Sequence, residues 1–424
     1  MRKLYLLITI ALLSKSAHST CITEKEALNK LTMDQAVESA LAKKKSIHAK
    51  YYNIKNYKNL RRGTLSTFIP NLSVRETAYD ASTAVSHAVE VSASQTLFNL
   101  SKVNHYKMYS TYMSAAKHDL QAHKESIRLA TETAFLSAWL IQQKLCLILL
   151  QFDASKEAFE KAKNQYNLNL LNKNDWLKAK SDHAANLAIV NSYQDEIAQA
   201  ESELEFYTTK EIRLLPSKDD ISPTILSWDH KKDITIEPFD FYYKEAINNR
   251  KDLKSKQDDI DLKDNTSKYY AKQYIPSVSL IGSTSRSHYR AGGAVLSKQA
   301  GIRASWSFDG LSSYFSAEAA KSEKLKAILE KNDLKSQIKF EIQKAHSALQ
   351  KEINNITAEK AKFTQNKNEF ELRRQEVDSG LISPVDFNIS EFTYENARFS
   401  WFSQLAGASL RERELLFACA YPEK

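Results

Sequence analysis

The stretch "SGLISPVDFNIS" (Ser379–Ser390) ends one of two very long helical patterns in this sequence. The 69 residues before Gly380 contain no Gly and no Pro. Gly380 suits the left-handed residue that ends a helix, and Pro384 suits the first residue of the next helix. Ser383 and Asp386 stand where a helix start places its capping residue and its capping-box acid. The stretch therefore predicts a tight reversal between two long antiparallel helices.

The pattern around this reversal occurs twice. Matching segments stand 206 to 211 residues apart, and the drift indicates a few residues inserted in the second copy. The pairs are STFIPNLSV (Ser66–Val74) with KQYIPSVSL (Lys272–Leu280), LFNLS (Leu97–Ser101) with SFDGL (Ser307–Leu311), and NLLNKNDWL (Asn169–Leu177) with GLISPVDFN (Gly380–Asn388). The first copy repeats the helix start at Asn172 to Asp175 without Gly or Pro. A duplicated chain is therefore predicted.

Each copy also carries an apolar stripe with a period of seven along its longest helical segment. The stripe comprises Ala138, Leu145, Phe152, Phe159 and Tyr166 in the first copy, and Ile342, Leu349, Ile356, Phe363, Phe370 and Val377 in the second. The last five positions of the second series lie 211 residues after those of the first. Such a stripe buries one seam between neighbouring helices and imposes a left-handed supercoil. Long coiled-coil helices are thus predicted in both copies.

Segments of alternating polarity precede each long helix. From Val85 to Leu97, every second residue is mostly apolar, and the residues between are mostly serine, threonine or glutamate. Strands of about ten residues with one apolar and one polar face are typical of transmembrane barrels. A soluble hairpin with one buried face fits the same pattern. Two hairpins give four strands, which are too few to close a barrel, so a membrane barrel would need several copies of the chain.

The composition favours long helices over a loop-rich fold. Of 424 residues, 26% are charged, and only 8 are Gly and 7 are Pro. The net charge is +9, but basic and acidic residues are interspersed. We therefore expect solvated helix faces and no nucleic-acid partner.

The N-terminus has the pattern of a secretory signal peptide. A basic start precedes an apolar run from Leu4 to Leu13, and small residues follow. We expect cleavage after Ser19 and export of the rest. A lipoprotein signal ending at Cys21 fits less well, because His18 stands where a leucine-like residue is wanted. No later segment has 18 consecutive apolar residues, so no transmembrane helix is expected.

The cysteines and histidines match no known site. The spacing of Cys21, Cys146 and Cys419 fits no metal motif. Cys146 lies in "KLCLILL" and is predicted to be a buried small hydrophobe. Cys21 and Cys419 would be in an oxidising compartment and could pair as a disulfide. No catalytic or phosphate-binding motif is present, so we expect neither an enzyme nor a cofactor.

These patterns predict the domain organisation. Residues 1–19 are a signal peptide, 20–212 a first repeat, 213–235 a linker and 236–424 a second repeat. The first repeat is expected to hold a β-hairpin at about 70–98 and long helices at about 101–171 and 173–212. The second is expected to hold a hairpin at about 276–308 and long helices at about 311–379 and 384–417.

The chain resembles the TolC-like outer-membrane efflux protein family in segments that keep the same order in both copies. They are LTMDQAVESAL at the start, FIPNLSV and YIPSVSL before the hairpins, SQTLFNLS and SWSFDGLSS after them, and SGLISPVDFNISE at the reversal. The resemblance covers Leu31 to about Phe417. It implies a mainly α fold with membrane β structure. Each chain would contribute four strands to a trimeric 12-stranded outer-membrane barrel and long helices to an α-helical periplasmic tunnel.

The resemblance also implies a function. The chain would be a passive exit duct in the cell outer membrane, with a large periplasmic part, serving a tripartite efflux or type I secretion system. Its partners would be two more copies in a homotrimer, a periplasmic adaptor, an inner-membrane transporter (a drug pump or an ABC exporter) and outer-membrane lipid. The alternative is an exported periplasmic coiled-coil scaffold whose hairpins stay in water.

Two aspartates are candidate functional residues by this resemblance. Asp386 matches an acid that lines the periplasmic aperture of the best-known family member, and Asp175 matches its counterpart in the first repeat. Helix capping alone would also explain an acid at both positions. The chain departs from that member at Ile389, where a second acid stands, at Ile382, where an arginine stands, and at Val377, where a tyrosine stands. Neither the double acidic ring nor the closing network of that member carries over intact.

Overall fold

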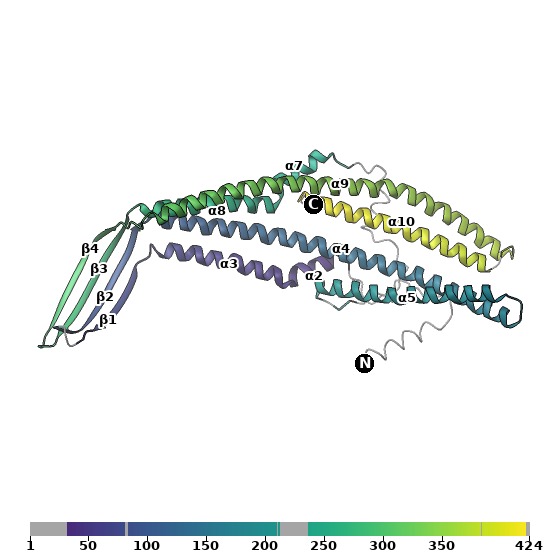
Figure 1. Cartoon of the computed structure of the whole chain (residues 1–424), viewed down its shortest axis with the longest axis horizontal. Coiled ribbons are helices and arrows are strands. Elements are labelled where there is room, and N and C mark those ends of the chain that lie inside the picture. The colour runs from purple at the N-terminus through teal and green to yellow at the C-terminus, as the bar shows by residue number, and fades with distance from the viewer. Residues whose placement is uncertain (1–31, 81–83, 210, 213–235, 383, 421–424) are drawn as a thin grey trace. The chain divides into compact units, whose positions relative to one another are not determined.

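The structure is a computed structural model that describes residues 32–80, 84–209, 211–212, 236–382 and 384–420 (Figure 1). The predicted signal peptide and linker lie outside these residues. The first copy holds α2 (Met33–Lys43), α3 (Lys45–Ser66), β1 (Asn71–Ala78), β2 (Val85–Phe98), α4 (Leu100–Asn167) and α5 (Lys173–Thr208). The second holds α7 (Phe239–Asn249), α8 (Lys251–Ala271), the short 3-10 helix η1 (Lys272–Tyr274), β3 (Ser277–Tyr289), β4 (Ala294–Ser305), α9 (Ser312–Asp378) and α10 (Pro384–Ala418). The predicted duplicated, mainly α fold with two β-hairpins is confirmed.

The elements divide into two compact units. Of the described residues, those within 1–44, 124–249 and 339–424 form the reversal unit, and those within 45–123 and 250–338 form the sheet unit. Helices α4 and α9 contribute to both units. Each unit therefore contains parts of both sequence repeats.

The sheet unit holds one antiparallel sheet in the order β1-β2-β3-β4. Each hairpin pairs its own two strands, and β2 pairs with β3, so the two copies meet in the middle of the sheet. Among the described strands, β1 pairs with β2 alone and β4 pairs with β3 alone. The outer edges of β1 and β4 therefore present backbone N–H and C=O groups that this sheet does not use.

One face of the sheet is apolar over its middle, and the other face is polar. The register aligns one row of the apolar face, which is Leu72, Ala93, Gly282 and Ala300. It aligns the adjacent row of the polar face, which is Ser73, Ser92, Ser283 and Gln299. On the polar face the hydroxyl groups of Ser73 and Ser92 are 2.7 Å apart and hydrogen-bonded. The predicted alternation is therefore confirmed.

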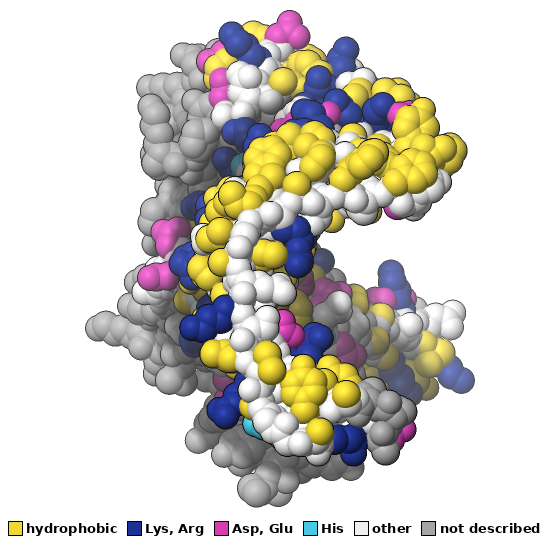
Figure 2. Space-filling model, turned by 90° about the vertical axis from the view of Figure 1, so that its left-hand side faces the viewer, with side chains coloured by type: hydrophobic (Ala, Val, Ile, Leu, Met, Phe, Trp, Pro, Cys, Tyr) yellow, Lys and Arg dark blue, Asp and Glu magenta, His cyan; other side chains and the backbone are white. Residues whose placement is uncertain are grey.

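The apolar face of the sheet is bare. Leu72 and Ile302 are each 72% exposed, and Val74 is also exposed. In the space-filling view, yellow hydrophobic side chains lie at the surface with dark blue Lys and Arg side chains near them (Figure 2). A soluble hairpin with one buried face would cover such side chains with its own chain. Within the described residues, these three stay uncovered, so the alternative of a self-contained soluble hairpin is disfavoured.

The strand-to-helix turns are built alike in the two copies. Asn99 precedes α4, and its Oδ1 accepts hydrogen bonds from Ser101 Oγ (2.8 Å) and the Lys102 backbone N–H (3.1 Å). Asp309 lies 210 residues later, and its Oδ2 accepts from the Ser313 backbone N–H (2.9 Å). The hydrogen bond from the Ser313 hydroxyl is the main cause that lowers the pKa of Asp309. Equivalent side chains thus satisfy the backbone donors where each long helix starts.

In the second copy, the predicted stripe packs α9 against α10, which lie side by side (Figure 1). Ile342 and Leu349 of α9 are buried. Phe363 of α9 stacks on Trp401 of α10, with ring centroids 4.8 Å apart. Phe370 stacks on Tyr394 at 4.9 Å. The seam therefore continues into the last turns of α9.

In the first copy, the equivalent stripe packs α4 against α5. Ala138 of α4 belongs to a buried cluster with Leu204 of α5. Phe159 stacks on His183 of α5, with centroids 5.4 Å apart. Near the reversal, Tyr166 stacks on Trp176 at 5.1 Å. The seam predicted from the period of seven is therefore confirmed in both copies.

The partner stripes on α5 and α10 also have a period of seven, and neither stripe was predicted from the sequence. They comprise Trp176, His183, Val190, Ile197 and Leu204 on α5, and Phe387, Tyr394, Trp401, Ala408 and Leu415 on α10. Each member on α10 lies 211 residues after its counterpart on α5. Aligning the two copies with the 211-residue offset of the reversals would have identified both stripes.

A buried carboxylate joins α4 to α10 within the reversal unit. Oε2 of Glu132 lies 2.9 Å from Nη1 of Arg413 on α10, and its Oε1 accepts from Nε of Arg128 at 3.2 Å. A buried charge without a partner is strongly destabilising, and the two arginines compensate the charge of Glu132. This contact links the first sequence repeat to the second.

By length and composition alone, α4 contains an 18-residue window apolar enough to cross a membrane, with a mean hydropathy of 1.5. Half of that window is buried inside the chain. The packing of α4 on α5 accounts for an apolar stretch of this kind, because a seam helix of a bundle meets the same criteria.

Candidate functional site at the helix reversals

The reversal after α9 has the conformation that its sequence predicts. Gly380 has φ +71°, and its N–H donates to the Val377 carbonyl at 2.9 Å. The Leu381 N–H donates to the Glu376 carbonyl at 2.8 Å. These are the two hydrogen bonds of a Schellman motif, in which a left-handed residue lets the chain satisfy the last helical carbonyls.

The reversal after α4 has the same motif with asparagine in place of glycine. Asn169 has φ 59°, and its N–H donates to the Tyr166 carbonyl at 3.0 Å. The Leu170 N–H donates to the Gln165 carbonyl at 2.8 Å. Asparagine tolerates this region better than other non-glycine residues, because its short polar side chain bonds locally. Asn169 stands 211 residues before Gly380, so the sequence offset pairs the two residues.

Asp175 has a capping role at the start of α5. Asn172 is the N-cap residue, and its Oδ1 accepts from the Asp175 backbone N–H at 2.9 Å. Its Nδ2 donates to the Asp175 carboxylate at 2.6 Å. The carboxylate is exposed in the first turn, where the helix dipole favours negative charge.

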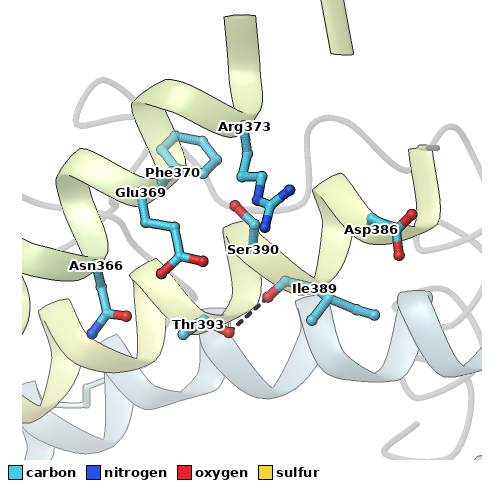
Figure 3. Close-up of a pocket in the computed structure, with 8 residues that line it drawn as sticks. All are labelled: Asn366, Glu369, Phe370, Arg373, Asp386, Ile389, Ser390 and Thr393. Atoms are coloured by element: carbon cyan, nitrogen blue, oxygen red, sulfur yellow. Dashed lines mark hydrogen bonds between the residues drawn. The ribbon is translucent and has the colours of Figure 1, made fainter. Parts of the chain in front are cut away.

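Asp386 lies in the first turn of α10, which starts at Pro384 as predicted. Its side chain is exposed and is one of those that line a cavity of ≈ 250 Å³ between α9 and α10 (Figure 3). The cavity is lined by Asn366, Glu369, Phe370 and Arg373 of α9 and by Asp386, Ile389, Ser390 and Thr393 of α10. Ser383, the predicted capping residue, lies outside the described residues.

The lining of this cavity does not contain two acidic residues on successive turns of α10. Ile389 follows Asp386 by about one helical turn and is exposed (Figure 3). Glu369 is the other acid in the lining, and Arg373 is the base. Arg373 is paired along its own helix, with Nη1 3.1 Å from Oε2 of Glu376. At the start of α10, one acid is therefore followed by an apolar side chain rather than by a second acid.

Each reversal also exposes a leucine that the sequence analysis did not single out. Leu170 is 74% exposed and Leu381 is 75% exposed. Each directly follows the left-handed residue, at the position that often packs back on its helix in Schellman motifs. The two leucines stand 211 residues apart, so the alignment of the copies could have found them. The reversals thus present matched apolar side chains beside Asp175 and Asp386.

The described residues contain no group of three or more His, Cys, Asp or Glu side chains that could hold a metal ion. Two histidines of the sheet unit have ordinary structural partners. Nδ1 of His118 lies 2.9 Å from Oδ2 of Asp258, and Nε2 of His123 lies 2.8 Å from the Ser46 hydroxyl.

The predicted pairing of Cys21 with Cys419 is wrong for Cys419. Cys419 is a buried thiol, and its Sγ donates to the Leu416 carbonyl at 3.3 Å. Cys146 is buried as predicted. Cys21 lies outside the described residues. Position in the sequence could not decide the pairing, because a disulfide requires a particular Cα separation and Cβ direction.

Several solved structures share this fold. No protein-family model matches the chain, and no curated protein matches it. The structure is similar to the CmeC outer membrane channel of Campylobacter jejuni, with TM-score 0.70 and 13% identity over 91% of this chain and 85% of that one. It is similar to the outer membrane protein VceC of Vibrio cholerae, with TM-score 0.67 and 13% identity over 91% and 95% of the two chains.

A third similar structure is a membrane protein from Pseudomonas aeruginosa, with TM-score 0.70 and 14% identity over 91% of this chain and 93% of that one. The chain therefore has the fold of outer membrane channels along nearly its whole described length. The resemblance to the TolC-like family is confirmed at the level of the fold.

We predict that Gly380→Ala lowers the free energy of unfolding by about 1–2 kcal/mol, because an L-residue is strained at a left-handed φ. No atom lies within 4 Å of the added Cβ, so the loss would come from the backbone alone. Gly63→Ala in α3 is the matched control, since its Cβ also meets nothing within 4 Å. It should raise stability by roughly 0.5–1 kcal/mol, because it is in a helix interior. Chemical unfolding of both variants measures the difference, and the same sign for both would contradict the assignment.

Proposed function

We propose that the chain is the subunit of an outer-membrane exit duct that passively passes substrate from an inner-membrane transporter and a periplasmic adaptor to the exterior. The observation that carries this proposal is the sheet. Its apolar side chains are bare on one face, its other face is polar, and both edges are open. The fold shared with outer membrane channels supports the same function.

The open edges determine how many chains the duct needs. In lipid, every backbone polar group must find a partner within the protein, so a membrane sheet must close. Four strands are too few to close a barrel. If β4 of one chain pairs with β1 of the next, three chains close a ring of 12 strands, as the family resemblance implies. The predicted signal peptide supplies the export that such a location requires.

We expect the full chain, expressed with its own N-terminus, to fractionate with the outer membrane and to have the mass of three chains in detergent. Its electrophoretic migration should change on heating, because closed barrels resist denaturation by detergent until heated. Native mass measurement and cell fractionation test this. A stable folded monomer in the periplasmic fraction would instead support the exported coiled-coil scaffold.

The two aspartates suit an aperture at the reversals. Asp175 and Asp386 are both exposed in the first turns that follow the two reversals. In the proposed trimer, three copies of each would surround one axis. Like charges gathered at a constriction repel each other and attract cations. Ile389 follows Asp386 by about one helical turn and is exposed, so it would make the ring apolar on one side of the charge.

We predict that Asp386→Asn assembles normally but conducts with lower cation selectivity and weaker block by multivalent cations. The amide removes the charge but can still accept a hydrogen bond, and loss of a cap costs only about 0.5–2 kcal/mol. Asp175→Asn should have the same effect more weakly. Single-channel recording in planar bilayers measures selectivity and block.

Asp182→Asn is the control, because Asp182 is an exposed acid further along α5. It should leave conduction unchanged. If Asp386→Asn lowers thermal stability while selectivity and block stay as in the unmodified protein, the aspartate is a helix cap and the aperture role is wrong.

The exposed leucines support docking of the adaptor at the reversals. Leu170 and Leu381 are among the most exposed large apolar side chains of the reversal unit. A partner that covers them would remove apolar surface from water at about 25 cal/mol per Å². The acids beside them would favour a partner with basic groups around an apolar centre.

We expect a photo-crosslinking residue placed at Leu381 to form a covalent product with a periplasmic adaptor in intact cells, because that side chain would lie inside the interface. The same residue at Leu329, an exposed position of the sheet unit, should not do so. Mass spectrometry identifies the crosslinked protein. Equal adaptor crosslinking from both positions would show that the reversals are not the docking surface.

A further inference from the structure

The apolar face of the sheet becomes cationic toward the β1–β2 and β3–β4 turns. Above the apolar rows, the register aligns Val74, Val91, Thr284 and Lys298 in one row. The next row is Glu76, Val89, Arg286 and Leu296, and the last row is Ala78, His87, His288 and Ala294. Two permanent cations therefore interrupt a face that is otherwise apolar in its middle.

Arg286 and Lys298 form a compact pair on neighbouring strands. They are diagonal neighbours on β3 and β4, a relation that places residues roughly 7–8 Å apart. Both are exposed, and neither forms an ion pair within the described residues. A guanidinium and an ammonium at this separation can both reach the oxygens of one phosphate group. The acidic residue in these rows of the face is Glu76. It lies on the edge strand β1, two strands away from Arg286.

The imidazoles of His87 and His288 lie directly beyond this pair. Their rings stack with centroids 4.2 Å apart and an interplanar angle of 17°. His288 follows Arg286 by two residues, so both side chains lie on the same face of β3. The stacked imidazoles therefore lie between the two cations and the turns. We name Arg286 and Lys298, with these two histidines above them, the cationic patch.

Exposed aromatic residues lie at both ends of the sheet: Tyr79 and Tyr289 near the turns, and three others at the opposite end. Trp306 and Phe308 follow β4, Phe98 ends β2, and all three are exposed. The helices continue from this end, since α4 follows β2 and α9 follows β4. Aromatic residues mark the border of a membrane, and a charge on the lipid face is tolerated only near a border. The cationic patch therefore marks the border opposite the helices, which in the proposed duct is the outer leaflet.

We propose that the cationic patch binds a phosphate group of the glycolipid headgroup in the outer leaflet, the phosphorylated glucosamine of lipid A. This inference rests on the proposed function, because it requires the apolar face to contact lipid. Apolar rows below the patch would contact the acyl chains, while Arg286 and Lys298 hold the phosphate above them. Three such patches, one for each chain, would surround the proposed barrel.

The test uses the full chain purified in detergent, with bis-phosphorylated lipid A as the probe in native mass spectrometry. The double variant Arg286→Gln/Lys298→Gln should weaken binding about 30-fold, since each basic residue near an anionic lipid surface contributes about fivefold. Dephosphorylated lipid A should bind the unmodified protein at least about tenfold more weakly. Lys298→Gln alone should weaken binding about fivefold, and it serves if the double variant fails to assemble.

The matched control is Arg75→Gln/Arg303→Gln. It removes two positive charges, as the patch variant does, but from the polar face of the sheet. Arg75 pairs with Glu90 and Arg303 pairs with Ser279, and both pairs belong to rows of the polar face. It should leave lipid A binding unchanged. Unchanged binding by the patch variants, equal binding of dephosphorylated lipid A, or equal loss in the control would each overturn the proposal. Displacement of lipid A by inorganic phosphate at equal concentration would instead assign the patch to a free anion.

Failure of this inference can be told apart from failure of the proposed function. If the chain does not fractionate with the outer membrane or does not form a trimer, the duct itself is wrong. If it does both and lipid A binds the patch variants as well as the unmodified protein, only the lipid site is wrong.

Discussion

The seven-residue seam between α4 and α5, repeated between α9 and α10, is the constraint on which the reversal unit depends. Its contacts continue to the ends of the helices, where Tyr166 stacks on Trp176 and Phe370 lies near Phe387. A seam that remains in register up to the last turn leaves only a short connection between its two helices. The chain must therefore stop one helix, reverse and start the next within a few residues. Gly380, Asn169 and Asn172 have conformations and hydrogen bonds that meet this requirement.

The sequence predicted the features that follow from local rules. A left-handed residue, a proline at the first helical position and a period of seven each have one physical cause, and each was found where expected. The faces of the strands were predictable for the same reason, since side chains alternate along a strand. Asn169 was missed because asparagine marks a left-handed position less strongly than glycine. The stripe on α5 was missed because His183 interrupts its apolar character.

Features that depend on distant parts of the chain could not be predicted in this way. Alternation shows which residues share a face, but it does not show that β2 pairs with β3. The cysteine prediction failed for a similar reason, because Cys419 was judged by its position in the sequence and not by its surroundings. The exposure of Leu170 and Leu381 is also a property of the folded reversals, since leucine in a sequence usually indicates burial.

The repeat of the sequence is not the unit of packing. Each compact unit combines elements from both copies, which meet through the β2–β3 ladder in one unit and through Glu132 and Arg413 in the other. A single copy would lose the β2–β3 ladder and the contact between Glu132 and Arg413, so each copy depends on the other at these places. Divergence between the copies is therefore constrained at these contacts and permitted where each copy faces outward.

The two equivalent reversals differ in their left-handed residue, which is Asn169 in the first copy and Gly380 in the second. This difference has a consequence for the symmetry of the assembly. Six reversals would surround the axis of the proposed trimer, and the duplication would arrange them with nearly sixfold repetition. Because Gly380 and Pro384 occur in one kind of reversal and Asn169 in the other, the two kinds alternate and the ring has only threefold symmetry. Any partner with six equivalent binding elements would meet two chemically different positions in turn. Such a ring can therefore distinguish neighbouring subunits of its partner even when those subunits are identical.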